Sequence, residues 1–321
     1  MIDIEPKDLT TQQVFGYLLG GIAPRPIALV STVAADGTVN LSPFSFFNTF
    51  GANPPIVAFS PSRRVRDNTT KDTYGNLLAT RECVIQAVTY AMVQQVSLAS
   101  TEYGSEIDEF VKSGLTKVPS DIVKPPRVQE SPFQMECRLQ QMITLGDGGG
   151  AGNLAICEVV KFHIAEDIIE NGVIQPERID LVARMGADFY TRASGEAVFE
   201  VRKPLVTKGI GYDQLPEFIR RSDVLTANNL AQLANTEHTP SADDIREFRD
   251  SLEPVAGDRQ AYERAARLDE YDTMMSLALT LAEDGAADAS ALMLRAAATA
   301  LDDDNVEFAW KAALLSRDYV R

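Results

Sequence analysis

Short apolar runs separated by turn residues fill the first two thirds of the chain. Residues 27–33 (IALVSTV) are rich in β-branched residues, and Asp36-Gly37 supplies a tight turn before residues 38–42, which predicts a hairpin. Residues 56–60 form a further apolar run, and residues 83–90 predict another strand. Residues 133–145 and 153–165 alternate apolar with polar positions around a glycine-rich turn, which predicts a second, long hairpin. Many short strands with local turns favour an antiparallel barrel over a doubly wound sheet.

Helical patterns are short in this region and dominate after it. Residues 10–20, 72–81, 91–100 and 105–113 predict short helices, whereas the proline-punctuated segment 115–132 predicts irregular chain. From residue 204 the pattern becomes helical, with capped pieces beginning at Thr226 and Ser241 and three alanine-rich helices at 259–284, 288–301 and 305–318.

The fold class expected from these patterns is mainly β with added α. Residues 1–203 form an antiparallel barrel domain, and residues 204–321 form an all-helical C-terminal extension. We expect the extension to pack against the barrel or across a dimer. A separate protein-binding module is the alternative.

Charge and composition narrow the function classes. The net charge is −16, and residues 204–321 hold 12 basic and 22 acidic residues, which argues against nucleic acid and anionic membrane surfaces as partners. No apolar run is long enough to predict a membrane span, and the N-terminus lacks the pattern of a signal peptide. The three cysteines are widely spaced and fit buried thiols in a reducing compartment, so we expect a cytoplasmic location.

A basic cluster stands out in this acidic chain. Arg63, Arg64, Arg66 and Lys71 lie just before Asp72-Thr73, whose residue types favour the start of a helix. Cations beside the free N–H groups of a helix N-terminus are suited to a phosphate group. A solvated basic loop is the alternative interpretation.

Three sequence motifs carry a family resemblance. Residues 25–32 (RPIALVST), 42–48 (SPFSFFN) and 71–73 (KDT) resemble the flavin reductase-like, FMN-binding split-barrel family, which includes flavoredoxin. The resemblance extends more weakly to about Pro204. It implies a small antiparallel split barrel that forms a homodimer and holds FMN near the subunit interface.

The resemblance also implies the cofactor-binding residues. The segments that match the family's ring-binding parts are Ser31, Thr32, Ser42, Pro43, Phe44 and Ser45. Those that match the surroundings of the ribityl phosphate are Ser60, Lys71, Asp72 and Thr73, and Arg25 and Asn48 are further candidates.

Two loops bear on the electron donor. The glycine run 146–152 follows a strand but opens no helix, so we interpret it as a flexible hairpin tip and not as a dinucleotide loop. Short flavin reductases of the family commonly carry Gly-Asp-His in this hairpin, and this chain has Gly146-Asp147-Gly148, a departure that counts against the usual pyridine-nucleotide site. The segment 184–190 is either a loop that returns over the flavin or a surface connector.

The residues predict neither a metal site nor a protein-based nucleophile. His163 and His238 are isolated, with no clustered carboxylates around them in the sequence, and neither a Gly-x-Ser-x-Gly nor a Walker motif is present. The catalytic residues stay unknown, because no side chain is an obvious acid or base and a bound cofactor would supply the chemistry.

The resemblance implies an FMN-binding oxidoreductase that transfers hydride from NADH or NADPH to flavin. One alternative is a flavoredoxin-like electron carrier reduced by a protein redox partner. The other is a flavin-containing scaffold that binds a partner through its C-terminal helices.

Overall fold

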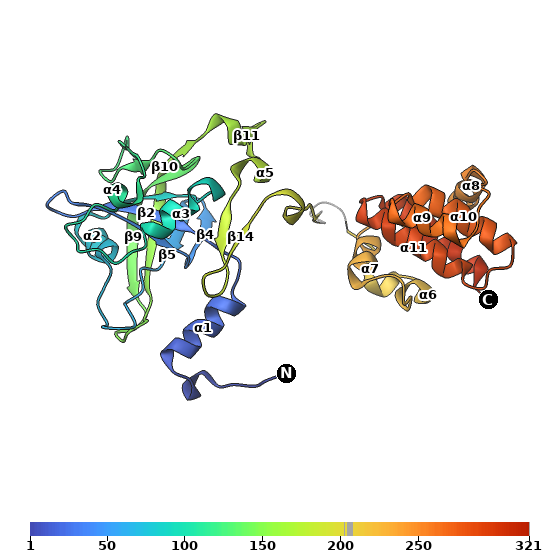
Figure 1. Ribbon diagram of the computed structural model, residues 1–321, viewed down its shortest axis with the longest axis horizontal. Coiled ribbons are helices and arrows are strands. Elements are labelled where there is room, and N and C mark those ends of the chain that lie inside the picture. The colour runs from blue at the N-terminus through green and yellow to red at the C-terminus, as the bar shows by residue number, and fades with distance from the viewer. Residues whose placement is uncertain (202, 204–207, 321) are drawn as a thin grey trace. The chain divides into compact units, whose positions relative to one another are not determined.

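The chain forms two compact units (Figure 1). The structure is a computed structural model, and it describes residues 1–201, 203 and 208–320. Unit 1 is Met1–Glu200 and unit 2 is Val201–Arg321. The boundary expected between residues 203 and 204 adjoins residues 204–207, which lie outside the described residues.

A seven-stranded sheet organises unit 1. Its strand order is β3-β2-β6-β9-β10-β5-β4, and the pairings are antiparallel, as the sequence predicts. The strands are β2 (Ala28–Val33), β3 (Val39–Phe44), β4 (Phe47–Ala52), β5 (Pro55–Phe59), β6 (Glu82–Gln86), β9 (Phe133–Thr144) and β10 (Asn153–Ile164). The sequence patterns did not reveal β4, because its side chains are mostly exposed and it lacks an apolar run.

Both faces of β2 are covered, which explains its nearly continuous apolar sequence. Ala28 and Val30 belong to a core cluster with Phe59, on one face of the sheet. Leu29 belongs to a second cluster that includes Phe110, where α3 (Val93–Leu98) and α4 (Glu109–Ser113) contribute side chains. Because successive strand residues point to opposite faces, a strand buried on both sides needs apolar residues at consecutive positions.

The helices of unit 1 are short. They are α1 (Thr11–Gly21), α2 (Asp72–Thr80), α3, α4 and α5 (Pro176–Ile179). Helices α2, α3 and α4 lie beside the strands of the sheet, and α1 stands apart from them (Figure 1). The helix expected at 105–113 begins only at Glu109, because the Asp108 side chain caps it by accepting a hydrogen bond from Phe110 N–H.

Small pairings of strands complete unit 1. A three-stranded sheet joins β1 (Arg25–Pro26), β13 (Val182–Arg184) and β14 (Tyr190–Arg192), so the segment near residue 184 returns to the start of the barrel. The segment expected to be irregular, 115–132, holds only the two-residue pair β7 (Lys117–Val118) and β8 (Arg127–Val128). A similar pair, β11 (Ile169–Glu170) and β12 (Val173–Ile174), follows β10.

The glycine hairpin between β9 and β10 is packed and not free, which corrects the expectation of a flexible tip. Gly150 N–H donates to the Arg63 carbonyl at 3.1 Å, and Arg63 N–H donates to the Ala151 carbonyl at 2.9 Å. A Cβ added at Gly149 would lie 2.9 Å from the Val65 carbonyl oxygen, and Gly150 has φ +87°. These glycines are required by close approach and by left-handed backbone.

Unit 2 is an all-helical body with its own apolar core. Its helices are α6 (Glu217–Arg220), α7 (Ala227–Ala234), α8 (Ala242–Ser251), α9 (Arg259–Arg267), α10 (Tyr271–Glu283), α11 (Ala289–Asp302) and α12 (Val306–Leu315). The expected caps at Thr226 and Ser241 are both confirmed as capping boxes. Tyr262 and Trp310 are fully buried in this core. Of the helices that the structure describes, none combines the length and the apolar character needed to cross a membrane.

One helix prediction in unit 2 is wrong. The single helix expected over 259–284 is two helices, α9 and α10, separated by residues 268–270. Asp269 adopts a left-handed backbone with φ 55°, which a continuous α-helix does not allow. Asp tolerates this conformation better than most residues, but the apolar periodicity across the break gives no sign of it.

Candidate functional site

A cavity of about 500 Å³ opens on unit 1 beside the basic cluster. One part of its wall is apolar and is formed by Phe15, Leu19, Pro43, Phe44, Phe46 and Val65. The rest carries polar and charged side chains, namely Arg25, Ser45, Ser60, Ser62, Arg63, Arg64, Arg66, Lys71, Glu102 and Arg184. The cavity therefore combines an apolar surface with a dense group of cations.

The cations come mainly from the basic loop, which we define as residues 60–71. Arg63 holds this loop closed on itself, because its Nε donates to Asn68 Oδ1 at 2.6 Å and its Nη2 to the Asn68 carbonyl at 2.7 Å. Arg64 Nη1 donates to the Thr70 carbonyl at 2.6 Å. The basic loop is also hydrogen-bonded to the glycine hairpin; for example, Asn68 Nδ2 donates to the Asp147 carbonyl at 2.9 Å.

The basic loop leads directly into α2. Lys71 is the N-cap residue of α2, and no side chain caps this helix end. The N–H groups of Asp72 and Thr73 are thus open to an acceptor, whereas the Tyr74 N–H donates to the Lys71 carbonyl at 3.0 Å. The helix end adds partial positive charge to that of the arginines and Lys71. A second cavity, of only about 20 Å³, lies against this helix end and shares Arg64, Lys71 and Glu102 with the larger one.

Arg25 is buried and connects two other segments of the cavity wall to its own strand. Its Nη1 donates to the carbonyls of Leu19 at 2.5 Å and Ile22 at 2.8 Å, at the end of α1. Its Nη2 donates to the Met185 carbonyl at 2.8 Å. Burial, and then the nearby Arg184 cation, lower the pKa of Arg25. Most of its hydrogen-bonding capacity is used on the protein, so it acts mainly as a support for the wall.

The two cavities bring together nine of the twelve residues that the resemblance implies. Those that line the larger cavity are Arg25, Pro43, Phe44, Ser45, Ser60 and Lys71. Those that line the smaller one are Ser42, Lys71, Asp72 and Thr73.

The other three residues lie outside both cavities. The hydroxyl of Ser31 is buried and donates to the Pro126 carbonyl at 2.5 Å, and Thr32 Oγ1 accepts from Asn76 Nδ2 at 3.0 Å. Asn48 is exposed on β4. In this structure the side chains of Ser31 and Thr32 stabilise the barrel behind the cavity.

Sequence reasoning missed two features of the cavity. Phe15 and Leu19 come from α1, which precedes the matched motifs, and Phe15 contacts Phe46 edge-to-face at 5.8 Å between ring centroids. Glu102 lies among the cations, and no motif marks it in the sequence. Arg184, the first residue of the segment 184–190, also lines the cavity.

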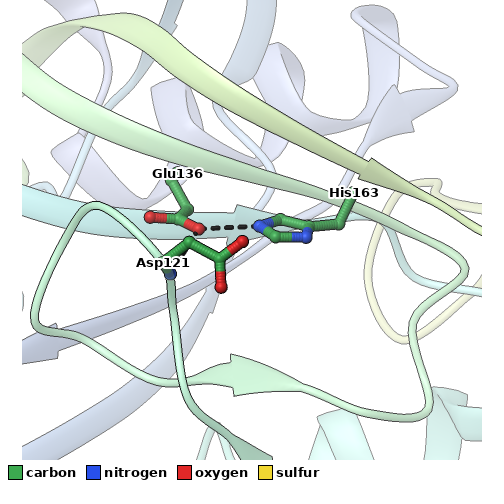
Figure 2. Close-up of side chains that lie close together, drawn as sticks. All are labelled: Asp121, Glu136 and His163. Carbon is green, nitrogen blue, oxygen red and sulfur yellow. Dashed lines mark hydrogen bonds and ion pairs between the residues drawn. The ribbon is translucent and has the colours of Figure 1, made fainter.

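His163 lies in a separate polar cluster on unit 1 (Figure 2), which corrects the expectation that no carboxylates surround it. His163 Nε2 is 2.7 Å from Oε1 of the fully buried Glu136, and Asp121 lies beside them and pairs with Lys161. Glu136 also accepts backbone N–H bonds from Asp121, Ile122 and Val123 at 2.6–2.9 Å.

In this cluster, Glu136 holds the 121–123 loop in place by accepting its backbone N–H groups. Burial would raise the pKa of Glu136, but the N–H groups of the loop and His163 lower it to about 2. Each oxygen of Glu136 already accepts two hydrogen bonds, so a metal ion would have to displace donors that hold the loop.

Comparisons with known proteins agree with this architecture. The model of the flavin reductase like domain matches residues 20–180. An uncharacterized protein of Halalkalibacterium halodurans is 34% identical over 207 residues, which cover 64% of this chain and 98% of that protein. An uncharacterized protein of Aquifex aeolicus is 34% identical over 196 residues, which cover 61% of this chain and 97% of that protein.

Two solved structures resemble unit 1. Nitrilotriacetate monooxygenase component B from Bacillus cereus is 32% identical with a TM-score of 0.59, and the match covers 63% of this chain and 98% of that one. The 2-nitrobenzoate 2-nitroreductase of Pseudomonas fluorescens is 25% identical with a TM-score of 0.56, and the match covers 65% of this chain and 100% of that one.

Fold and comparisons together define an antiparallel split barrel of the flavin-binding class, followed by a helical extension. The chain belongs to the flavin reductase-like family. Membership of this family supports a flavin cofactor.

Proposed function

We propose that this protein binds FMN in the 500 Å³ cavity and catalyses hydride transfer from NADH or NADPH to flavin. The observation that carries the proposal is the juxtaposition of an apolar wall with a cation cluster at the uncapped N-terminus of α2. The cavity volume lies within the roughly 300–1,000 Å³ typical of cofactor sites.

The residues present fit FMN at both ends. Phe44, Phe46 and Pro43 offer an apolar surface suited to an aromatic ring system. Arg64 and Lys71, with the N–H groups at the start of α2, suit a terminal phosphate. A single cation cluster matches one phosphate end, whereas FAD also requires room for an adenosine.

A bound flavin supplies the redox chemistry by accepting hydride and passing electrons on. The chain's own residues bind and orient the cofactor. Lys71 and Arg64 would hold the phosphate, and Arg25 keeps the end of α1 and the 185 segment in place at the cavity wall.

A second function is favoured by the position of the glycine hairpin. Residues 146–152 contact the basic loop but do not line the cavity, so they present no side chain to a nicotinamide. A flavoredoxin-like electron carrier, which takes electrons from a protein donor, needs no such side chain.

Two measurements test these proposals. The purified protein is expected to show flavin absorbance, and heat release followed by chromatography is expected to yield FMN. Recovery of FAD, or of no flavin, would contradict the FMN proposal. Steady-state oxidation of NADH and NADPH by the flavin-loaded protein supports the reductase, whereas reduction only by a protein donor supports the carrier.

A further inference from the structure

Glu102 lies inside the cation cluster on the turn that follows α3. Its Oε1 is 3.1 Å from Arg64 Nε and 3.7 Å from Lys71 Nζ, and its Oε2 is 3.2 Å from Arg66 Nη2. Both carboxylate oxygens therefore contact cations. Glu102 also lines both the larger and the smaller cavity, so its carboxylate stands where the two meet.

The same donors suit a phosphate. Arginine forks and lysine ammonium groups bind carboxylates and phosphates by the same charge-assisted hydrogen bonds. Slight burial would raise the pKa of Glu102, but hydrogen bonding to Arg64 and the charges of Lys71, Arg64 and Arg66 lower it. Glu102 is consequently an anion at neutral pH, and a phosphate bound to these cations would repel it.

We propose that Glu102 is an internal counter-ion that competes with the flavin phosphate for Arg64, Arg66 and Lys71. This inference rests on the proposed function, because it assigns the phosphate of FMN to the basic loop. The Glu102 side chain is 42% exposed, so it can turn into solvent when phosphate enters. Gly104, two residues on, lies on the same exposed turn.

The consequence is an exchangeable flavin. With the cavity empty, Glu102 neutralises part of a cluster that would otherwise repel itself. Part of the phosphate binding energy is then used to displace Glu102, which weakens binding of FMN but leaves binding of a flavin without phosphate unchanged.

The test compares FMN with riboflavin, which lacks the phosphate. Interactions of partly exposed charges are weak, but a phosphate carries nearly two charges, so Glu102→Gln is expected to bind FMN about tenfold more tightly. Riboflavin affinity is expected to stay constant. The gain for FMN is expected to shrink as salt rises, because exposed charges are screened.

Glu106→Gln is the matched control. Glu106 is exposed a few residues along the same segment, and its substitution changes the net charge equally but outside the cluster. FMN affinity that is unchanged or weaker in Glu102→Gln, or equally increased in Glu106→Gln, would overturn the inference while flavin binding by the natural chain stands. Failure of both the natural chain and Glu102→Gln to bind FMN would overturn the proposed function and this inference with it.

Discussion

Replacement of Glu136 by Gln tests how much the hydrogen bonds between Glu136 and the 121–123 loop stabilise unit 1. Glutamine keeps the shape of the side chain but turns one oxygen into an NH₂ group, which then faces backbone N–H donors. Burial would raise the pKa of Glu136 and its hydrogen bonds lower it from 4.5 to about 2, a difference that corresponds to about 3 kcal/mol. We therefore expect Glu136→Gln to destabilise unit 1 by about 3 kcal/mol at pH 7.

The sign of the pH dependence follows from the lowered pKa. The contribution of Glu136 is fully present above the ordinary pKa of 4.5 and is lost as the pH falls toward the folded value of about 2. Glutamine does not titrate. The difference in stability between the natural chain and the variant is thus expected to be constant from pH 7 to about 5 and to shrink below pH 4.5.

Because the chain has two units, the stability of unit 2 serves as an internal control for the effect of Glu136→Gln on unit 1. Native-state hydrogen exchange of peptides from β6 and β9 reports on unit 1. The single tryptophan of the chain, Trp310, is buried in unit 2, so its fluorescence in urea reports on that unit. Glu136→Gln is expected to change the first signal and leave the second constant. The exposed Glu166→Gln is expected to change neither by more than about 0.5 kcal/mol.

Protection of β6 and β9 that is the same in Glu136→Gln and the natural chain at pH 7 would refute the reasoning. It would mean that solvent or rearranged donors replace the four hydrogen bonds. An equal loss in both units would point instead to a general folding defect.

Three further predictions concern the site. Lys71→Ala is expected to weaken FMN binding by about 1.5–3 kcal/mol in calorimetry, and an unchanged affinity would place the phosphate elsewhere. Light scattering is expected to give a homodimer of about 70 kDa rather than the 35.1 kDa monomer, because Tyr17 and Leu18 of α1 and the adjoining Ile22 are exposed apolar residues. A monomer in dilute solution would contradict this. NADH oxidation is expected to be slow with a KM near or above about 1 mM. If the glycine hairpin overlies the bound flavin, Gly148→His, where an added Cβ meets no atom within 4 Å, is expected to raise kcat/KM. Fast turnover by the natural chain would assign the nicotinamide to another segment, with 184–190 the first to examine.

The antiparallel sheet was predictable from sequence because its evidence is local. Alternation in 133–145 and 153–165 and the Asp36-Gly37 turn each specify a strand or hairpin without distant partners. The break at Asp269 was not predictable, because apolar periodicity continues across it and only the backbone conformation differs.

The candidate site was predictable where charge or motif marks it. The basic loop and Lys71 stand out in an acidic chain, and the structure places them on one cavity. Glu102 was missed because its partners are distant in the sequence. Arg66 and Arg64 lie 36 and 38 residues before it, and no motif links Glu102 to them. Ser31 and Thr32 belong to a motif that the resemblance assigns to the flavin ring, but in the structure their side chains form hydrogen bonds within the barrel and line neither cavity.

The support given by Arg25 has a consequence for synthesis of the chain. Arg25 is made early, but its hydrogen bond to the Met185 carbonyl spans 160 residues. During translation the β2–β3 hairpin can pair as soon as it emerges, whereas the wall around the cavity stays incomplete until residue 185 has left the ribosome. A nascent chain arrested before that point would contain the basic loop and most motif residues and still lack a closed cofactor site. Flavin capture is therefore expected late in synthesis, after nearly all of unit 1 has been made.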